Sequence, residues 1–168
     1  MLNPGRGPQT RRSYTTSKPR LLHLYFEAQV AQRPNKAAVE FSDESLTYAE
    51  LDAYANQIAH RLISRGVRPG DLVALYLKKS PRLYAAMLAI LKAGAGYVPI
   101  DPKFPLERIR AILEDSGAKA FVTEHALSAA VDGAIPTPIL NLDGDHTAIS
   151  RLPATVPPLA REIEPTDL

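Results

Sequence analysis

The chain is most constrained between residues 91 and 105, where two glycines and three prolines fall within a short stretch. An apolar stripe at helical spacing precedes this stretch, so we expect a helix that ends near Ala93. Gly94 can then adopt the left-handed conformation that stops a helix. The prolines prevent another helix from following at once, and residues 97–100 predict a short strand. Pro105 suits the first turn of the next helix. The stripe consists of Leu83, Met87, Ile90 and Leu91.

The sequence Gly94-Ala95-Gly96 invites interpretation as a phosphate loop because it offers two glycines. A dinucleotide-binding loop, however, lies between a strand and a following helix, whose amino terminus faces the pyrophosphate. Here the glycines follow a helix and precede a strand, and Pro99 stands where the third glycine would come. The order of the elements therefore argues against phosphate binding at this position.

The sequence after residue 72 alternates between short apolar strands and helices of about a dozen residues. This alternation predicts parallel strands joined by right-handed crossovers, in an open, mostly parallel α/β sheet with flanking helices. The strands are apolar at consecutive positions, so both faces of the sheet need cover. With about three crossover helices available, we expect an apolar face to stay exposed. The predicted strands are residues 73–77, 97–100, 120–122 and 138–140.

The amino-terminal half predicts a helix, a small hairpin and a second helix. Leu22, Phe26 and Val30 share one face of the first helix, which Pro34 ends. Residues 37–41 and 46–47 form the hairpin. Thr47 can cap the second helix, with Glu50 reaching back to its amide and Leu46 and Leu51 spaced as a hydrophobic staple. We therefore assign Thr47 to capping and not to catalysis.

The stretch from Leu91 to Arg108 resembles a signature of the amino-acid-activating adenylation domains of nonribosomal peptide synthetases, within the acyl-adenylate-forming ligase family. The usual form is Leu-Lys-Ala-Gly-x-Ala-Tyr-Val-Pro-Leu/Ile-Asp-Pro-x-Tyr-Pro-x-x-Arg. Gly96 replaces the usual alanine and Phe104 the usual tyrosine. A second family signature, Leu-Thr-Tyr-x-Glu-Leu, stands at residues 46–51. The resemblance implies the N-terminal subdomain of the adenylate-forming enzyme fold, here preceded by the hairpin and a leader.

The same resemblance implies ATP, magnesium and a phosphopantetheine carrier for the complete enzyme, which activates an amino acid. In the family, a Gly-rich loop ending in lysine follows a Pro-x-Asp-Leu stretch. Pro165-Thr166-Asp167-Leu168 resembles that stretch, and the 168 residues contain no such loop. We therefore expect residues 21–168 to be the N-terminal part of an AMP-binding adenylation domain, truncated before the phosphate-binding loop. No catalytic, cofactor-binding or metal-ligating residue is assigned.

Three functional hypotheses follow. The chain could be a structural portion of an ATP-dependent amino-acid ligase, catalytically incomplete alone, whose partner is the remainder of the domain or synthetase. It could instead be an autonomous interaction module that binds a partner chain through an exposed sheet face. A third hypothesis is a small α/β domain that binds a nucleotide at the carboxyl ends of its strands.

Residues 1–20 differ in composition from the rest, being basic, free of acids and rich in glycine, proline, serine and threonine. They are predicted to form a disordered leader or linker, with a transit peptide or a nucleic-acid-binding arm as alternatives. They hold five of the 20 basic residues, which leaves 15 basic against 18 acidic residues in a mildly acidic remainder. We expect neither a nucleic-acid nor a membrane partner, since no apolar run approaches the roughly 18 residues that span a bilayer. A chain without cysteine predicts a cytoplasmic protein.

Other candidate sites are given structural interpretations. The four histidines are too dispersed for a metal site and are expected at the surface or locally hydrogen-bonded. Asp143-Gly144-Asp145 hints at calcium but predicts a turn. Ser116-Gly117-Ala118-Lys119 matches the sequence pattern of a serine-lysine hydrolase motif, but Gly117 breaks the helix that the motif requires. Three acids are expected to form a solvated helix face. The histidines are His23, His60, His125 and His146, and the acids are Glu107, Glu114 and Asp115.

Overall fold

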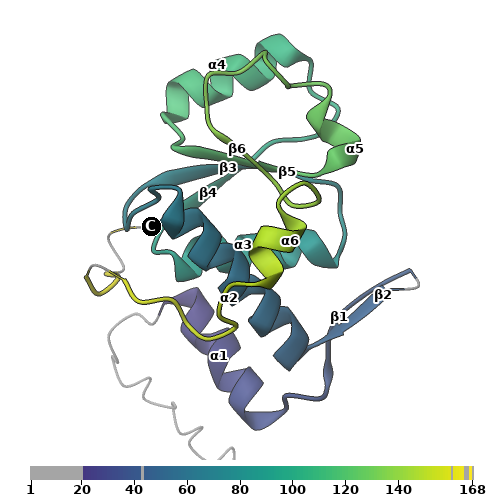
Figure 1. Ribbon diagram of the computed structural model, residues 1–168, viewed down its shortest axis with the longest axis vertical. Coiled ribbons are helices and arrows are strands. Elements are labelled where there is room, and N and C mark those ends of the chain that lie inside the picture. The colour runs from purple at the N-terminus through teal and green to yellow at the C-terminus, as the bar shows by residue number, and fades with distance from the viewer. Residues whose placement is uncertain (1–20, 43, 160, 165–166, 168) are drawn as a thin grey trace, which may run out of the picture.

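A computed structural model describes residues 21–42, 44–159, 161–164 and 167; the predicted leader lies outside the described residues. At its centre is a parallel four-stranded sheet in the order β4-β3-β5-β6 (Figure 1). The predicted sheet is confirmed, with strand ends shifted by a residue or so. The strands are β3 (Leu72–Tyr76), β4 (Gly96–Pro99), β5 (Ala120–Thr123) and β6 (Ile139–Asn141).

Helices cover both faces of this sheet. α2 (Tyr48–Ser64) and α3 (Pro81–Lys92) pack on one face, and α4 (Leu106–Ser116) packs on the other (Figure 1). The short α5 (His125–Ser128) joins the α4 side through Leu127, and α6 (His146–Ser150) joins the α2 side through Ile149. Among the described residues, no helix combines the length and apolar character needed to cross a membrane.

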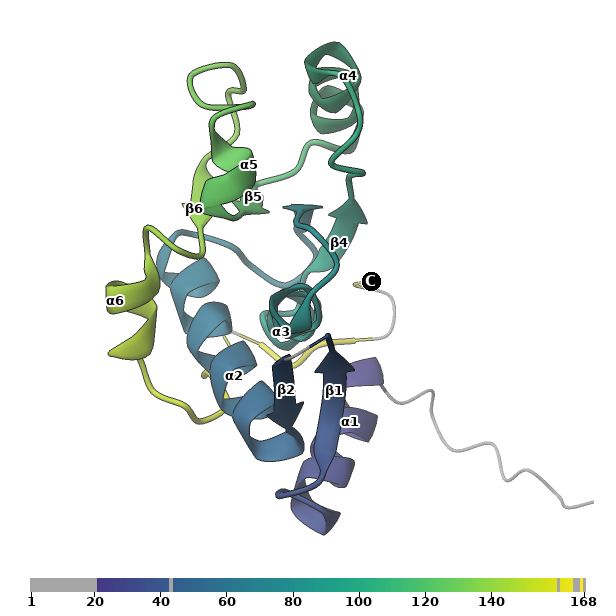
Figure 2. The ribbon, with the colours of Figure 1, turned by 90° about the vertical axis from the view of Figure 1, so that its right-hand side faces the viewer.

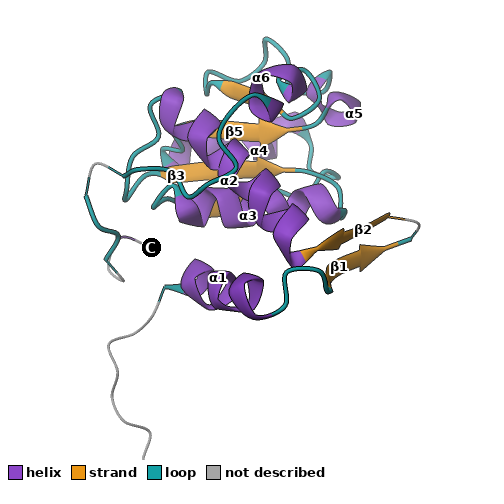
Figure 3. Cartoon of the chain, turned by 60° about the horizontal axis from the view of Figure 1, so that its bottom comes forward, coloured by secondary structure: helices purple, strands orange, loops and turns teal. Residues whose placement is uncertain are grey.

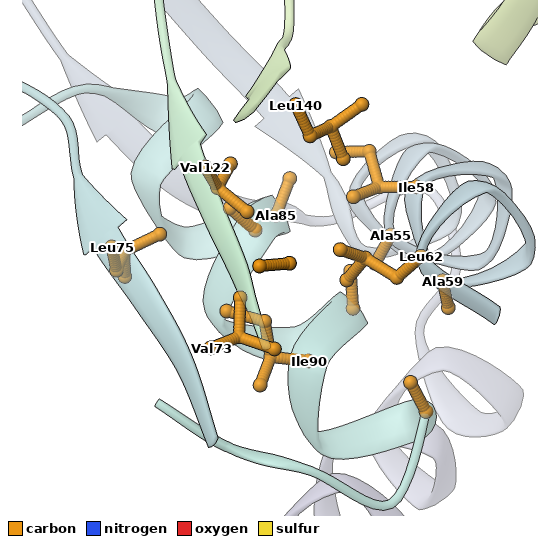
Figure 4. Packing of buried hydrophobic residues seen from close by; sticks show 14 of the residues in the cluster. Ala55, Ile58, Ala59, Leu62, Val73, Leu75, Ala85, Ile90, Val122 and Leu140 are labelled. Carbon is orange, nitrogen blue, oxygen red and sulfur yellow. The ribbon is translucent and has the colours of Figure 1, made fainter. Parts of the chain in front are cut away.

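Alternation along β3 divides the core into two layers. Val73 and Leu75 pack with α2 and α3, whereas Ala74 and Tyr76 pack with α4. Figure 4 shows Val73 and Leu75 on the same side as Ile90. All four residues of β5 are buried, so our expectation that a sheet face stays exposed is wrong. The part left open is the edge strand β4, whose Pro99 is exposed.

Small side chains let α2 and α3 approach each other and the sheet. Ala55, Ala59, Ala85 and Ala89 are all fully buried (Figure 4 labels the first three). The predicted stripe on α3 is therefore only partly correct, because Leu83 and Met87 are half-buried while the alanines face the core. Fully buried leucine and isoleucine side chains beside them contribute about 1.5–3 kcal/mol each.

The helix ends follow the predicted capping residues closely. Thr47 and Glu50 form a complete capping box, with the Thr47 amide donating to the Glu50 carboxylate at 2.8 Å. At the end of α3, Gly94 has a φ of 78°, and the amide of Ala95 donates to the carbonyl of Ile90 at 3.0 Å. Pro105 occupies the N-cap of α4, one position before the predicted first turn.

α1 (Leu22–Gln32) and the hairpin of β1 (Ala37–Phe41) and β2 (Glu44–Thr47) lie beyond α2 and α3 from the sheet (Figures 2 and 3). Phe26 contacts Tyr48, with ring centroids 5.5 Å apart. Leu22, which we expected to face inward, is 62% exposed. The buried side chain of this helix is His23, so an apolar pattern alone misjudged which face docks.

The last quarter of the chain contains α6, a helix that the sequence analysis did not predict. After α6 the chain returns along α2, which holds it through side-chain hydrogen bonds. Asn56 donates to the carbonyl of Ala154 at 2.8 Å, and His60 bonds the carbonyl of Thr155 at 3.0 Å.

Replacing Thr47 tests the capping assignment. Thr47→Ala should lower the free energy of unfolding by about 1 kcal/mol, because the amide of Glu50 loses its acceptor. Thr47→Ser keeps the hydroxyl and should cost much less. Urea denaturation of the two variants measures the difference. Equal losses for alanine and serine would contradict the assignment.

The two signature glycines provide a matched pair for a second test. A side chain at residue 94 would combine a φ of 78° with a contact of 2.9 Å to Pro69, so Gly94→Ala should lose about 1–2 kcal/mol or more. At Gly96 a Cβ meets only the Leu72 side chain, which is 37% exposed and can move. Gly96→Ala, which restores the usual family residue, should therefore leave stability unchanged or slightly raised. Thermal unfolding of both variants decides, and a larger loss for Gly96→Ala would refute this account.

Candidate functional site

The signature stretch forms one wall of an apolar groove at the carboxyl ends of β3 and β4. The groove has a volume of about 670 Å³, and α3 forms its other wall. Ligands of open α/β sheets bind outside these strand ends. Most of the side chains that line the groove are aliphatic or aromatic, while Lys79 and Asp101 bring opposite charges to it. The lining side chains used below are Tyr84, Met87, Tyr97, Pro99 and Phe104.

A second apolar pocket, of about 240 Å³, adjoins this groove and shares Tyr84, Met87 and Tyr97 with it. Its remaining walls come from α1, the hairpin and α2, including Phe26 and Leu51. The groove and the pocket together form a continuous apolar surface beside the edge strand β4. Such a surface is suited to packing against another protein segment.

Asp101, the acid of the signature, closes its own turn. Its carboxylate accepts a hydrogen bond from the amide of Lys103 at 2.9 Å, and its carbonyl accepts one from the amide of Phe104 at 2.9 Å. The carbonyl of Pro102 accepts from the Tyr76 hydroxyl at 3.3 Å. The signature therefore shapes the groove wall.

Gly94 and Gly96 lie at the opposite, amino edge of the sheet. The amide of Gly70 donates to the carbonyl of Gly94, and the amide of Gly96 donates to that of Asp71, both at 2.9 Å. Gly96 opens β4, so the glycines lie away from the carboxyl edge where ligands bind.

Asp143 ties together loops from three strands at the carboxyl edge. Its carboxylate pairs with Arg82, at the start of α3, and accepts a hydrogen bond from the amide of His125 at 2.7 Å. The Arg82 side chain, and next the His125 amide, hold the pKa of Asp143 below 3.8. Glu124 similarly accepts a hydrogen bond from the amide of Lys78 at 3.3 Å. The chain's own carboxylates thus occupy backbone donors at this edge.

Asp145, two residues later, joins the same region to α2. It pairs with Arg61 at 2.6 Å and with Arg65 at 2.7 Å. The Asn141 side chain accepts hydrogen bonds from the amides of Asp143 and Gly144, which closes the predicted turn. Asp143 and Asp145, which suggested a calcium site in the sequence, therefore pair with arginines. The sequence analysis predicted neither set of ion pairs.

Lys92 of the signature is buried in a charged cluster between three helices. Its side chain is 0% exposed, and its ammonium lies 2.5 Å from Glu27 of α1 and 3.0 Å from Asp52 of α2. Asp52 also accepts a hydrogen bond from Asn56 at 3.0 Å. Lys92 therefore links α1 and α2 to the end of α3.

The histidines divide into exposed and buried types. His125 and His146 are exposed and His60 is hydrogen-bonded to the chain, as we expected. His23 contradicts the expectation, because it is only 5% exposed and its Nδ1 has no partner among the described residues. Sequence position gave no signal of this burial, since Glu27 and Lys92, which act on it, lie on two helices.

The part of the chain that the structure describes offers no arrangement that fits ATP or magnesium. The described residues contain no group of three histidine, cysteine or acidic side chains placed to hold a metal ion. At the carboxyl edge, the backbone amides of Lys78 and His125 already donate to Glu124 and Asp143.

The acids on α4 lie on its solvated face, as predicted. Glu107, Glu114 and Asp115 are all exposed.

Arg161 connects Asp167, the last described residue, to the amino edge of the sheet. Its guanidinium donates to both carboxylate oxygens of Asp167, at 2.6 and 2.7 Å, and approaches the carbonyl of Pro69 at 3.4 Å. The Arg161 hydrogen bonds lower the pKa of Asp167 to about 2. The other residues of the predicted Pro-x-Asp-Leu stretch lie outside the described residues.

Sequence comparison identifies relatives among large synthetases. A family model described as "AMP-binding enzyme" matches residues 26–165. Malpibaldin synthetase of Mortierella alpina is 47% identical over 121 residues, 72% of this chain and 2% of the relative. Tyrocidine synthase 3 of Brevibacillus parabrevis is 46% identical over 115 residues, 68% of this chain and 2% of the relative. The matched region thus spans 2% of the length of each of these relatives.

Solved structures share the fold. A variant of the nonribosomal peptide synthetase FmoA3, in a form bound to alpha-methyl-L-serine-AMP, superposes with a TM-score of 0.76 at 36% identity. The match covers 84% of this chain and 16% of that one. VinN gives a TM-score of 0.81 at 20% identity over 89% of this chain and 40% of its own, a likeness of fold alone.

Asp143→Asn tests the tie at the carboxyl edge. The variant keeps the size of the side chain but loses the charge that pairs with Arg82, so it should unfold at slightly lower urea concentration than the unmodified chain at pH 7. The pKa of Asp143 is depressed in the folded state, so its contribution is present above pH 3.8 and lost as the pH falls through the folded pKa. The stability gap should therefore shrink in acid. Asp132→Asn, at an exposed acid, is the control, and a gap independent of pH would contradict the assignment.

Proposed function

Because the chain belongs to the AMP-binding enzyme family, we propose that residues 21–168 form the amino-terminal part of an amino-acid-activating adenylation domain. The activity of the whole domain is ATP-dependent activation of an amino acid, whose product passes to a phosphopantetheine carrier. This chain contributes scaffold, and its partner is the remainder of the adenylation domain or synthetase. Residues 1–20 form a separate leader, and the cytoplasm is the proposed location.

The observation that carries this proposal is the placement of the signature stretch. Its Tyr97, Pro99 and Phe104 line the apolar groove beside the edge strand. An edge strand with a flanking apolar groove needs cover from another segment. The remainder of an adenylation domain supplies such a segment, which explains why a scaffold region carries a strong family signature.

A chain that acts alone as an interaction module remains the second candidate. The groove favours it as well, since any partner with an apolar surface can pack there. The binding surface is then the β4 edge and its groove, because the sheet faces are covered. The nucleotide-binding hypothesis loses support, since Glu124 and Asp143 occupy the donors at the strand ends that phosphate needs.

Amino-acid-dependent exchange between ATP and pyrophosphate tests the proposal. The 168-residue chain alone should catalyse no exchange, because its sequence has no phosphate loop and its described residues form no metal-binding group. Mixing it with the following region of a related adenylation domain should produce exchange. Robust exchange by the chain alone would refute its role as a scaffold.

A charged substitution in the groove provides the matched control. Met87→Glu places a carboxylate in the apolar groove and should abolish the exchange obtained on mixing, while Ser128→Glu, on α5 and outside the groove lining, should not. If neither variant altered the mixture's activity, the groove would not be the docking surface. If mixing never produced exchange but the groove still bound the other region, the interaction-module candidate would gain support.

A further inference from the structure

α1 is held to the rest of the fold by few apolar contacts. Its side chains facing the other helices include Phe26, which contacts Tyr48, and the polar pair His23 and Glu27. Tyr25, on the outer face, is 55% exposed. A helix docked mainly through polar groups detaches more readily than one held by an apolar stripe.

The charged cluster beneath α1 is its main anchor. Glu27 is the only contribution of α1 to the pairing of Lys92 among the described residues, and it lies 2.5 Å from the ammonium. If α1 leaves, Lys92 keeps Asp52 at 3.0 Å, so the lysine is not left unpaired. The cluster therefore tolerates release of the helix better than a single ion pair would.

His23 sits beside this anchor with its ring buried. One ring nitrogen has no partner among the described residues, and the charges that face the ring are Glu27 on its own helix, Lys92 on α3 and, through Lys92, Asp52 on α2. A proton added to the ring would create a second buried cation next to Lys92. Release of the helix would hydrate that cation.

We propose that α1 is an acid-sensitive latch: protonation of His23 releases the helix from Lys92 and opens the apolar pocket that Leu22 and Phe26 help to close. The floor of that pocket includes Leu51 and Leu91, which are buried core residues. Release of α1 in acid would thus expose part of the core.

The direction of the effect follows from the ionisation of His23. Burial is the largest influence and lowers its pKa below 6.5; Glu27 raises the pKa and Lys92 lowers it. The docked helix therefore prefers the neutral ring. Docking is at full strength above pH 6.5 and weakens as the pH falls toward the folded pKa, by at most about tenfold in the opening constant per pH unit.

Hydrogen exchange of the full chain between pH 7.5 and pH 5 tests the latch. After correction for intrinsic exchange rates, the opening constant of the α1 amides should rise as the pH falls below 6.5, while α2 and α3 keep their protection. In His23→Gln the opening constant should be independent of pH. The control His146→Gln, at an exposed histidine, should respond as the unmodified chain does.

Two outcomes would overturn the proposal: an unmodified chain whose α1 ignores pH, or a His23→Gln variant that keeps the response. Loss of protection in α2 and α3 together with α1 would also overturn it, since it indicates global unfolding. Direct titration of the His23 ring by NMR is a second measurement, and charging at or above pH 6.5 would refute the latch. Glu27→Gln should increase hydrogen exchange of the α1 amides at every pH. If these amides were as protected as in the unmodified chain, Glu27 would not be the anchor of α1.

Discussion

The structure depends on covering both faces of a short parallel sheet within one small chain. Parallel strands are apolar at consecutive positions, so each of β3 and β5 sends side chains into two layers. α2 and α3 fill one layer and α4 the other. Alanines at Ala55, Ala59 and Ala85 allow two helices to share the first layer. Because two helices fit on one face, both faces of the sheet are covered although the chain has few crossover helices.

Polar ties at the helix ends then fix how the layers are placed. Asp143 and Asp145 follow β6 and hold α3 and α2 through arginines, and Lys92 at the end of α3 holds α1 and α2. The ties lie at both ends of α3, so this helix is fixed in position beside the groove that it helps to form. A rigid wall is what a docking groove requires, because ordering a mobile wall on binding would weaken association.

Sequence reasoning succeeded where the physical signal was local. Thr47 and Glu50 are three residues apart, and the left-handed stop at Gly94 depends on that residue alone. The alternation of strands and helices predicted the parallel sheet. Reasoning failed for ties between distant residues: Arg82 and Asp143 are 61 positions apart, and Lys92 and Glu27 are 65. Charged side chains at such separations carry no periodic pattern, so the sequence analysis assigned Asp143 to a turn and predicted neither ion pair.

The signature in the groove wall also shows what a sequence motif leaves undetermined. The signature at residues 91–108 identified the family. The motif alone does not say whether Asp101 and Lys92 contact a substrate or stabilise the fold. In the structure, Asp101 bonds its own turn and Lys92 is buried between acids of two helices. The signature residues are thus explained by the backbone turn, the helix stop and the interhelical anchor that they build. A strong motif in this chain marks a shape that another segment can pack against.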